Sequence, residues 1–216
     1  MNPGQTREHS VNNKKVSVLN LANMLTLLRI VLAPVFLIVF FLPKEYSTWA
    51  IPALWVIFFI SEITDYFDGL AARKLNLTSD FGKFFDPFAD TLIQITCFLC
   101  FLIDGIWGSG IIPAILFLLV IYREFGILFI RNLMLRKGIT LAARMGGKIK
   151  TVIYIIAVGA SLLAVSIERL GLYENLLAYF KTGAFVIFII SVAAAVISFI
   201  DYLIIYIKAQ NNQEKK

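Results

Sequence analysis

Residues 65–90 read DYFDGLAARKLNLTSDFGKFFDPFAD, and this stretch contains five aspartates and one arginine. It lies in a chain of 216 residues, of which 59% are hydrophobic. Four of the aspartates fall inside or at the ends of apolar segments that are long enough to cross a bilayer. Charge is costly at that depth, so ionisable residues there call for a functional explanation. These four form the acidic set: Asp65, Asp68, Asp86 and Asp90.

The composition predicts the fold class. Only 16% of the residues are charged, whereas about a quarter are charged in soluble domains. Apolar runs of about 20 residues, the length that spans the hydrocarbon core, recur along the chain. We therefore expect an all-α integral membrane protein with six transmembrane helices, over residues 27–43, 48–70, 85–104, 110–132, 149–168 and 180–207.

The two ends of the chain are polar. Residues 1–15 are expected to form a cytoplasmic tail, and residues 209–216 a second one. Between them, residues 16–208 are expected to form a single membrane domain. The segment 16–30 is amphipathic, so it predicts a short N-terminal helix along the membrane interface. The N-terminus lacks the apolar region of a cleavable signal peptide, and all the apolar segments are expected to be retained.

The distribution of basic residues predicts the orientation. All but three of the 20 Lys and Arg residues fall in the tails, in the connections after the second and fourth helices, or beside them. The exceptions are Lys44, Arg169 and Lys181. Because basic residues favour the cytoplasmic side, both termini and the active site are expected there. The predicted location is the bacterial inner membrane.

Several common kinds of active site have no matching motif. Cys97 and Cys100 form a C-x-x-C pair, but both lie inside an apolar helix and there is no second pair, which disfavours a zinc or redox site. The one histidine, His9, lies in the N-terminal tail. A general base within the membrane domain is therefore expected to be a carboxylate. No nucleic-acid partner is expected.

The spacing of the acidic set brings its members together. Asp65 and Asp68 are three residues apart on the second predicted helix, and Asp86 and Asp90 are four residues apart on the third. Residues at these spacings share one face of a helix. The two helices are antiparallel neighbours because a short connection joins them. Their acidic faces are expected to meet just below the cytoplasmic surface.

Four carboxylates in one poorly hydrated place repel one another. Two divalent cations would remove this conflict, and oxygen ligands at this density suit Mg²⁺ or Mn²⁺ rather than zinc. The small residues Gly69, Ala72 and Gly82 would leave room for a ligand beside the metals. Two alternatives stay open at this point: a network of hydrogen bonds between helices, and a proton or cation pathway of a transporter.

The pattern D-x-x-D-G-x-x-A-R-x₈-G-x-x-x-D-x-x-x-D runs from Asp65 to Asp90 and resembles the signature of the CDP-alcohol phosphatidyltransferase family. The resemblance implies six membrane helices, an amphipathic N-terminal helix and a homodimer. It also implies a reaction, in which an alcohol attacks a CDP-linked lipid and CMP leaves. By the family pattern the acidic set binds two metals, Asp90 also acts as the base, and Gly69 and Arg73 contact the nucleotide. Further nucleotide-site candidates are Ala72, Asn23 and Thr26.

Wider stretches resemble the bacterial branch of this family that uses sn-glycerol 3-phosphate as the acceptor and CDP-diacylglycerol as the donor. They are NLANMLTLLRIVLAPVF, GKFFDPFAD, YREFGILFIR and GKIKT. One position departs from that branch, because Thr91 stands where a lysine is usual. Other acceptors therefore stay open: inositol phosphate, serine, choline or a lipid.

A phosphorylated acceptor needs cations besides the metals. We expect these from the basic set, defined as Arg123, Arg131, Arg144 and Lys148, with Lys150 as a weaker candidate. A neutral acceptor would not need these charges, although the orientation of the chain in the membrane would place some of them here in any case.

Overall fold

The computed structural model describes the backbone of residues 21–75, 80–136 and 145–213, and the side chains of residues 24–65, 85–134 and 147–210. These parts of the chain are helical and contain no strand. Two short 3₁₀ turns, η1 (Lys44–Tyr46) and η2 (Glu174–Leu176), precede the second and sixth helices. The long helices are α1 (Leu21–Phe40), α2 (Ser47–Leu75), α3 (Asp80–Asp104), α4 (Ile111–Arg136), α5 (Met145–Leu170) and α6 (Leu177–Gln213).

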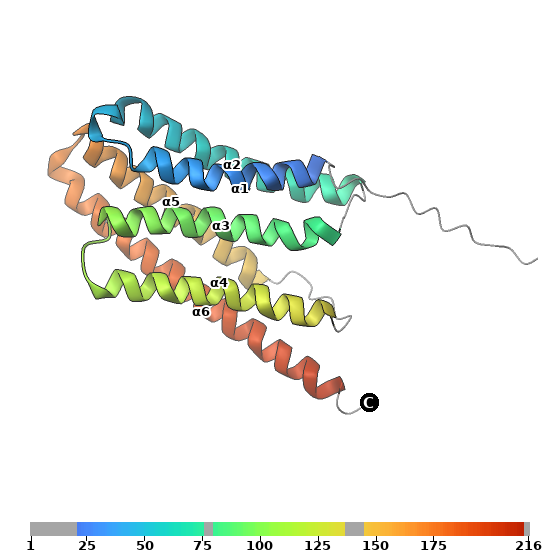
Figure 1. Ribbon diagram of the computed structural model, residues 1–216. Coiled ribbons are helices and arrows are strands. Elements are labelled where there is room, and N and C mark those ends of the chain that lie inside the picture. Colours follow the sequence, from blue (N-terminus) through green and yellow to red (C-terminus); the bar gives the residue numbers. More distant parts are fainter. Residues whose placement is uncertain (1–20, 76–79, 137–144, 214–216) are drawn as a thin grey trace, which may run out of the picture.

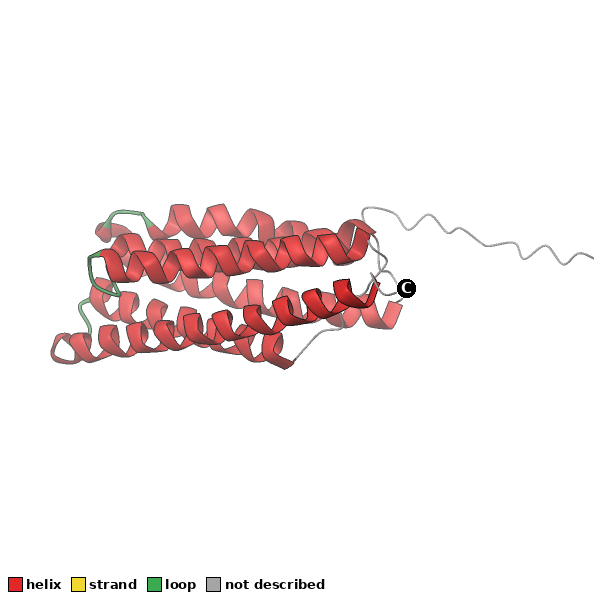
Figure 2. Cartoon of the chain, turned by 90° about the horizontal axis from the view of Figure 1, so that it is seen from below, coloured by secondary structure: helices red, strands yellow, loops and turns green. Residues whose placement is uncertain are grey.

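The six helices form one bundle, in which α5 and α6 run obliquely to α1, α3 and α4 (Figure 1), and Figure 2 shows the bundle from a second direction. α1 packs against α2 and α3, while α6 packs against α4 and α5. The turns that join α1 to α2, α3 to α4 and α5 to α6 lie at one end of the bundle, called here the far end. The opposite end holds the first residues of α1, α3 and α5 and the last residues of α2, α4 and α6.

The predicted fold class, an all-α membrane protein, is confirmed. Helices α2 to α6 each contain a segment long and apolar enough to cross a membrane, while the described apolar part of α1, Met24–Phe40, is shorter. Residues 16–20 of the predicted interfacial helix lie outside the described residues, and its remainder begins α1. The helices also extend beyond the predicted spans, since α2 continues to Leu75 and α6 to Gln213.

Two of the far-end turns stop their helices in the same way. Gly105 follows α3 with φ of 75°, and Gly171 follows α5 with φ of 64°. In each turn the next backbone N–H returns to the helix: Ile106 donates to the Phe101 carbonyl at 3.2 Å, and Leu172 to the Ile167 carbonyl at 3.0 Å. This left-handed glycine cap is a common helix end. It satisfies carbonyls that would otherwise lack partners at the membrane boundary.

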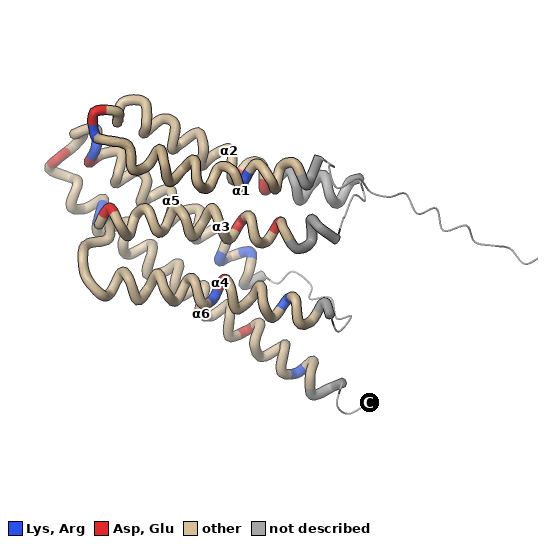
Figure 3. The backbone as a smooth tube through the Cα atoms, viewed as in Figure 1, with Lys and Arg blue, Asp and Glu red and all other residues tan. Residues whose placement is uncertain are grey.

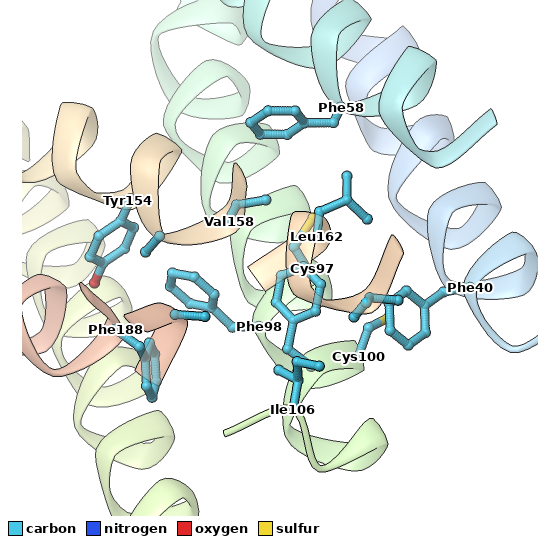
Figure 4. Close-up of a cluster of buried hydrophobic side chains, with 14 of the residues drawn as sticks. Phe40, Phe58, Cys97, Phe98, Cys100, Ile106, Tyr154, Val158, Leu162 and Phe188 are labelled. Atoms are coloured by element: carbon cyan, nitrogen blue, oxygen red, sulfur yellow. The ribbon is translucent and has the colours of Figure 1, made fainter. Parts of the chain in front are cut away.

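Aromatic side chains fill the middle of the bundle (Figure 4). The ring of Phe98 on α3 contacts Tyr154 of α5 and Phe188 of α6, with centroids 5.2 Å apart in both pairs. Trp107 stacks on Phe188 at 3.7 Å and donates its indole N–H to the Ser161 hydroxyl at 3.0 Å. This packing joins α3, α5, α6 and the turn between α3 and α4, and it gives the buried indole nitrogen a hydrogen-bond partner.

A charged clamp closes the far end. Arg169 on α5 donates to Asp104 at the end of α3 at 2.8 Å and to the Phe40 carbonyl at the end of α1 at 2.5 Å. Its guanidinium also lies 4.4 Å from the centre of the Phe40 ring. Three helix ends are therefore fixed to one another by a single arginine.

The two free cysteines, Cys97 and Cys100, are buried among the apolar side chains of the core (Figure 4). Buried free cysteines of this kind pack as small apolar residues.

Candidate active site

A cavity of about 240 Å³ lies in the half of the bundle away from the far end, and all six helices contribute to its wall. Charged positions gather in this half and at the far end, with a largely uncharged length between them (Figure 3). Most of the polar lining comes from α2, α3, α4 and α5. The polar residues of the wall are Arg29, Ser61, Glu62, Asp65, Asp90, Thr91, Gln94, Arg123, Glu124, Arg131, Lys148, Lys150, Thr151 and Tyr202.

One side of the cavity is acidic and is organised by α1. Arg29 is 1% exposed, and its Nη1 atom donates to Oδ1 of Asp65 at 2.8 Å and to Oδ1 of Asp90. Thr26, one turn earlier on the same face of α1, donates its hydroxyl to Asp86. Side chains of α1 therefore hold three members of the acidic set, which belong to α2 and α3.

This arrangement shows where the predicted site residues lie. The structure brings Asp65, Asp86 and Asp90 together as the sequence indicated. The side chains of Asp68, Gly69, Ala72, Arg73 and Gly82 lie outside the described residues, although their positions belong to α2 and α3, and the same holds for Asn23 on α1.

The donor chemistry of this side suits a hard divalent cation. The carboxylates of Asp65 and Asp90 meet at the buried guanidinium of Arg29, and Asp86, one turn before Asp90 on α3, accepts the hydrogen bond of Thr26. The described side chains supply no nitrogen or sulfur ligand there. Such oxygen donors are the ligands that Mg²⁺ and Mn²⁺ prefer. The described side chains include no group of three or more His, Cys, Asp or Glu placed to hold a metal by themselves. The expected ligand set is therefore incomplete among the described side chains, because it also requires Asp68, which lies outside them.

The other side of the cavity carries a buried network of charges. Glu124 on α4 is 5% exposed. Both of its carboxylate oxygens accept hydrogen bonds from Nη1 of Arg123, at 2.8 and 2.9 Å. Lys150 on α5 approaches the same carboxylate at 2.7 Å and donates to Gln94 of α3 at 3.3 Å. Arg123 also donates to Ser198 of α6 at 3.1 Å. The network ties four helices together.

The basic set is therefore not uniform. Arg123 lines the cavity, but Glu124 pairs with it and also with Lys150, so one carboxylate partly compensates both cations. Arg131 and Lys148 line the same cavity and have no ion-pair partner among the described side chains. Arg144 lies outside the described residues. Thr91, the position that departs from the branch pattern, is buried in the cavity wall.

Sequence reasoning missed several lining residues. Glu62 lies one helical turn before Asp65 on α2, and Gln94 one turn after Asp90 on α3, so their spacing could have placed them on the acidic faces. Tyr202 on α6 carries no such signal, because the apolar sequence around it does not indicate which face meets the cavity.

Comparisons with known proteins show the family to which the chain belongs. The family model described as CDP-alcohol phosphatidyltransferase matches residues 19–204, and the chain belongs to this family. It is 36% identical over 152 residues to a protein of Mycobacterium tuberculosis (strain H37Rv) named probable phosphatidylglycerophosphate synthase, with 70% of each chain covered.

Two further relatives are named CDP-diacylglycerol–glycerol-3-phosphate 3-phosphatidyltransferase. The protein of Bacillus subtilis is 39% identical over 153 residues, which cover 67% of this chain and 77% of that one. The protein of Haemophilus influenzae is 32% identical over 186 residues, which cover 85% and 91%. The predicted resemblance is confirmed: the chain is a multi-pass membrane enzyme of the CDP-alcohol phosphatidyltransferase class, a family that generally uses divalent metal ions.

The buried network yields a first prediction. Glu124→Gln keeps the size of the side chain but removes its charge, which leaves Arg123 and Lys150 without their counter-charge. We expect the free energy of unfolding to fall by about 3 kcal/mol. Glu174→Gln, at an exposed position in η2, is the control and should change it by less than about 0.5 kcal/mol. Unfolding in detergent measures both, and equal effects would show that the network does not stabilise the bundle.

Proposed function

We propose that this protein transfers a phosphatidyl group from CDP-diacylglycerol to sn-glycerol 3-phosphate and releases phosphatidylglycerophosphate and CMP. The observation that carries the proposal is the division of one cavity into an acidic side, around Asp65 and Asp90, and a basic side with Arg131 and Lys148. A metal-bound diphosphate and an anionic acceptor require these two environments next to each other. The names of the relatives support the same substrates.

On the acidic side, the acidic set would bind two Mg²⁺ or Mn²⁺ ions. When bound, such ions neutralise phosphate oxygens and stabilise the charge that develops during displacement. The nucleotide of the donor would lie beside the small residues of α2, with Gly69, Ala72 and Arg73 as contacts and Asn23 and Thr26 approaching from α1. Thr26 would also keep Asp86 in place, because its hydroxyl donates to that carboxylate.

Asp90 would act as the general base. Its carboxylate lines the cavity on the acidic side, where an acceptor hydroxyl would reach it. A carboxylate oxygen of Asp90 would take the proton of that hydroxyl as the hydroxyl oxygen attacks the lipid-side phosphorus. The bond from this phosphorus to the oxygen of the CMP phosphate breaks, and CMP leaves. Arg29 would keep Asp90 oriented toward the cavity through their contact.

The phosphate of the acceptor would bind Arg131 and Lys148. Both cations line the cavity, and no described carboxylate compensates them. Arg123 and Lys150 would form a fixed wall behind the acceptor, because Glu124 holds them. Arg144 stays a candidate for the same phosphate from the sequence alone.

The membrane orientation and assembly complete the proposal. The cavity lies in the half of the bundle that carries both termini, and the three basic residues Lys44, Arg169 and Lys181 lie at the far end. By the positive-inside rule the active site and both termini would face the cytoplasm, and the membrane we propose is a bacterial inner membrane. The homodimer that the resemblance implies stays a prediction.

The reaction is tested by CMP release. Purified protein in detergent, supplied with CDP-diacylglycerol, Mg²⁺ and sn-glycerol 3-phosphate, should release CMP and form phosphatidylglycerophosphate, and chelation of the metal by EDTA should stop both. Serine, choline, inositol phosphate and a lipid alcohol serve as competing acceptors. CMP release with one of these, and none with glycerol 3-phosphate, would overturn the acceptor and leave the transfer chemistry intact.

The base assignment predicts the effect of Asp90→Asn. Loss of the proton acceptor should lower kcat by at least about 10²-fold, while the protein still binds a cytidine nucleotide. Asp104→Asn is the control, because this aspartate belongs to the far-end clamp and lies outside the cavity. Single-turnover CMP release checks both variants. If Asp90→Asn retained most of its kcat, the base would have to be another group.

The acceptor site predicts a change in KM rather than in kcat. Arg131→Gln and Lys148→Gln each remove one uncompensated cation, so KM for sn-glycerol 3-phosphate should rise by roughly tenfold. KM for CDP-diacylglycerol should change little. Lys208→Gln, an exposed lysine of α6 outside the cavity wall, should leave both values unchanged. Steady-state kinetics with each substrate varied in turn would refute the assignment if the two variants behaved like Lys208→Gln.

A further inference from the structure

The contact between Arg29 and two carboxylates of the acidic set has a consequence for metal binding. We propose that Arg29 is a positioning residue that holds Asp65 and Asp90 together before the metals bind and then competes with the metals for these carboxylates. The inference rests on the proposed metal-dependent function and adds a role for α1, the helix that contributes no member of the acidic set.

The first argument is the cost of the charges in isolation. The Arg29 side chain is 1% exposed, so its guanidinium is almost completely removed from solvent. A buried arginine without a counter-charge is strongly unfavourable, and so are neighbouring carboxylates that face only one another. The guanidinium therefore needs the negative charge of the carboxylates, and the carboxylates need its positive charge. In the absence of metal, Arg29 supplies the positive charge that lets α2 and α3 bring their aspartates to one place.

The second argument is the identity of the atoms. A single nitrogen, Nη1, donates to Oδ1 of Asp65 on α2 and to Oδ1 of Asp90 on α3. The point where these oxygens converge is already occupied by a positive charge. A divalent ion that takes the same oxygens must weaken the contacts of Nη1, and it adds two further positive charges beside the guanidinium. Arg29 and the metals are therefore competitors for one set of donors.

A thermodynamic result follows from this competition. Removal of the guanidinium should destabilise the metal-free protein more than the metal-bound protein, because only the metal-free protein depends on Arg29 for compensation. A ligand that binds the folded state stabilises it by an amount set by its affinity. The metal affinity must therefore rise when Arg29 is neutralised, whereas a purely structural arginine would leave it unchanged.

The protein contains a matched control. Arg169 is also a largely buried arginine, 10% exposed, and it also pairs with an aspartate, Asp104, at 2.8 Å. It lies at the far end of the bundle, remote from the acidic set. The experiment compares Arg29→Gln with Arg169→Gln in the full chain. Tm is measured in EDTA and in saturating Mn²⁺, and the Kd of Mn²⁺ is measured by electron paramagnetic resonance of the free ion.

We expect both variants to have a lower Tm than the wild type in EDTA. In Mn²⁺ the loss should largely disappear for Arg29→Gln and persist for Arg169→Gln. Arg29→Gln should also bind Mn²⁺ about tenfold more tightly than the wild type, a factor typical of coupled binding events, while Arg169→Gln should have the wild-type Kd. An Arg29→Gln protein that folds only when Mn²⁺ is present would meet the same expectation.

Other outcomes would overturn the proposal in distinguishable ways. A wild-type protein that does not bind Mn²⁺ would refute the metal-dependent function together with this inference. Normal Mn²⁺ binding by the wild type, with an unchanged or higher Kd for Arg29→Gln, would refute the role of Arg29 alone. If Arg29→Gln did not fold in either condition, Arg29→Met, which is uncharged and of similar length, would decide: Mn²⁺ binding tighter than wild type supports the competition, and equal or weaker binding refutes it.

Discussion

Charge that is buried within a membrane has to be compensated, and the pairing of Arg29 with the aspartates of α2 and α3 meets this constraint. The packing of the first three helices depends on it, since α1 contacts both α2 and α3 and carries the residues that hold their carboxylates. The second network, centred on Glu124, applies the same constraint to α3, α4, α5 and α6. The cavity lies where the two networks face each other.

Because the two networks are separate, the cavity has an acidic side and a basic side. Acidic side chains line the cavity from α2 and α3, and basic side chains line it from α4 and α5. Glu124 keeps the basic side from becoming a uniform positive surface, because this single carboxylate pairs with both Arg123 and Lys150. Arg131 and Lys148 have no ion-pair partner among the described side chains. One cavity therefore combines two opposite electrostatic environments.

The sequence predicted the parts of this architecture that depend on local spacing. Hydropathy predicts where the helices span the membrane. Helical periodicity and one short connection predict that Asp65, Asp86 and Asp90 lie close together. The compensation could not be predicted in this way, because Arg29 meets Asp90 across 61 positions and Lys150 meets Gln94 across 56. Such contacts depend on how helices rotate about their axes. Arg123 looked available for an anion in the sequence, and only the packed bundle shows its carboxylate partner.

The aromatic core has a consequence for the cell as well as for the fold. Phe98, Tyr154 and Phe188 are each 0% exposed, and they fill the bundle between the cavity and the far end. The packed rings therefore separate the cavity from the far end by an apolar layer, without a continuous hydrated path along the bundle. A membrane that holds this bundle keeps its barrier while polar side chains gather inside it.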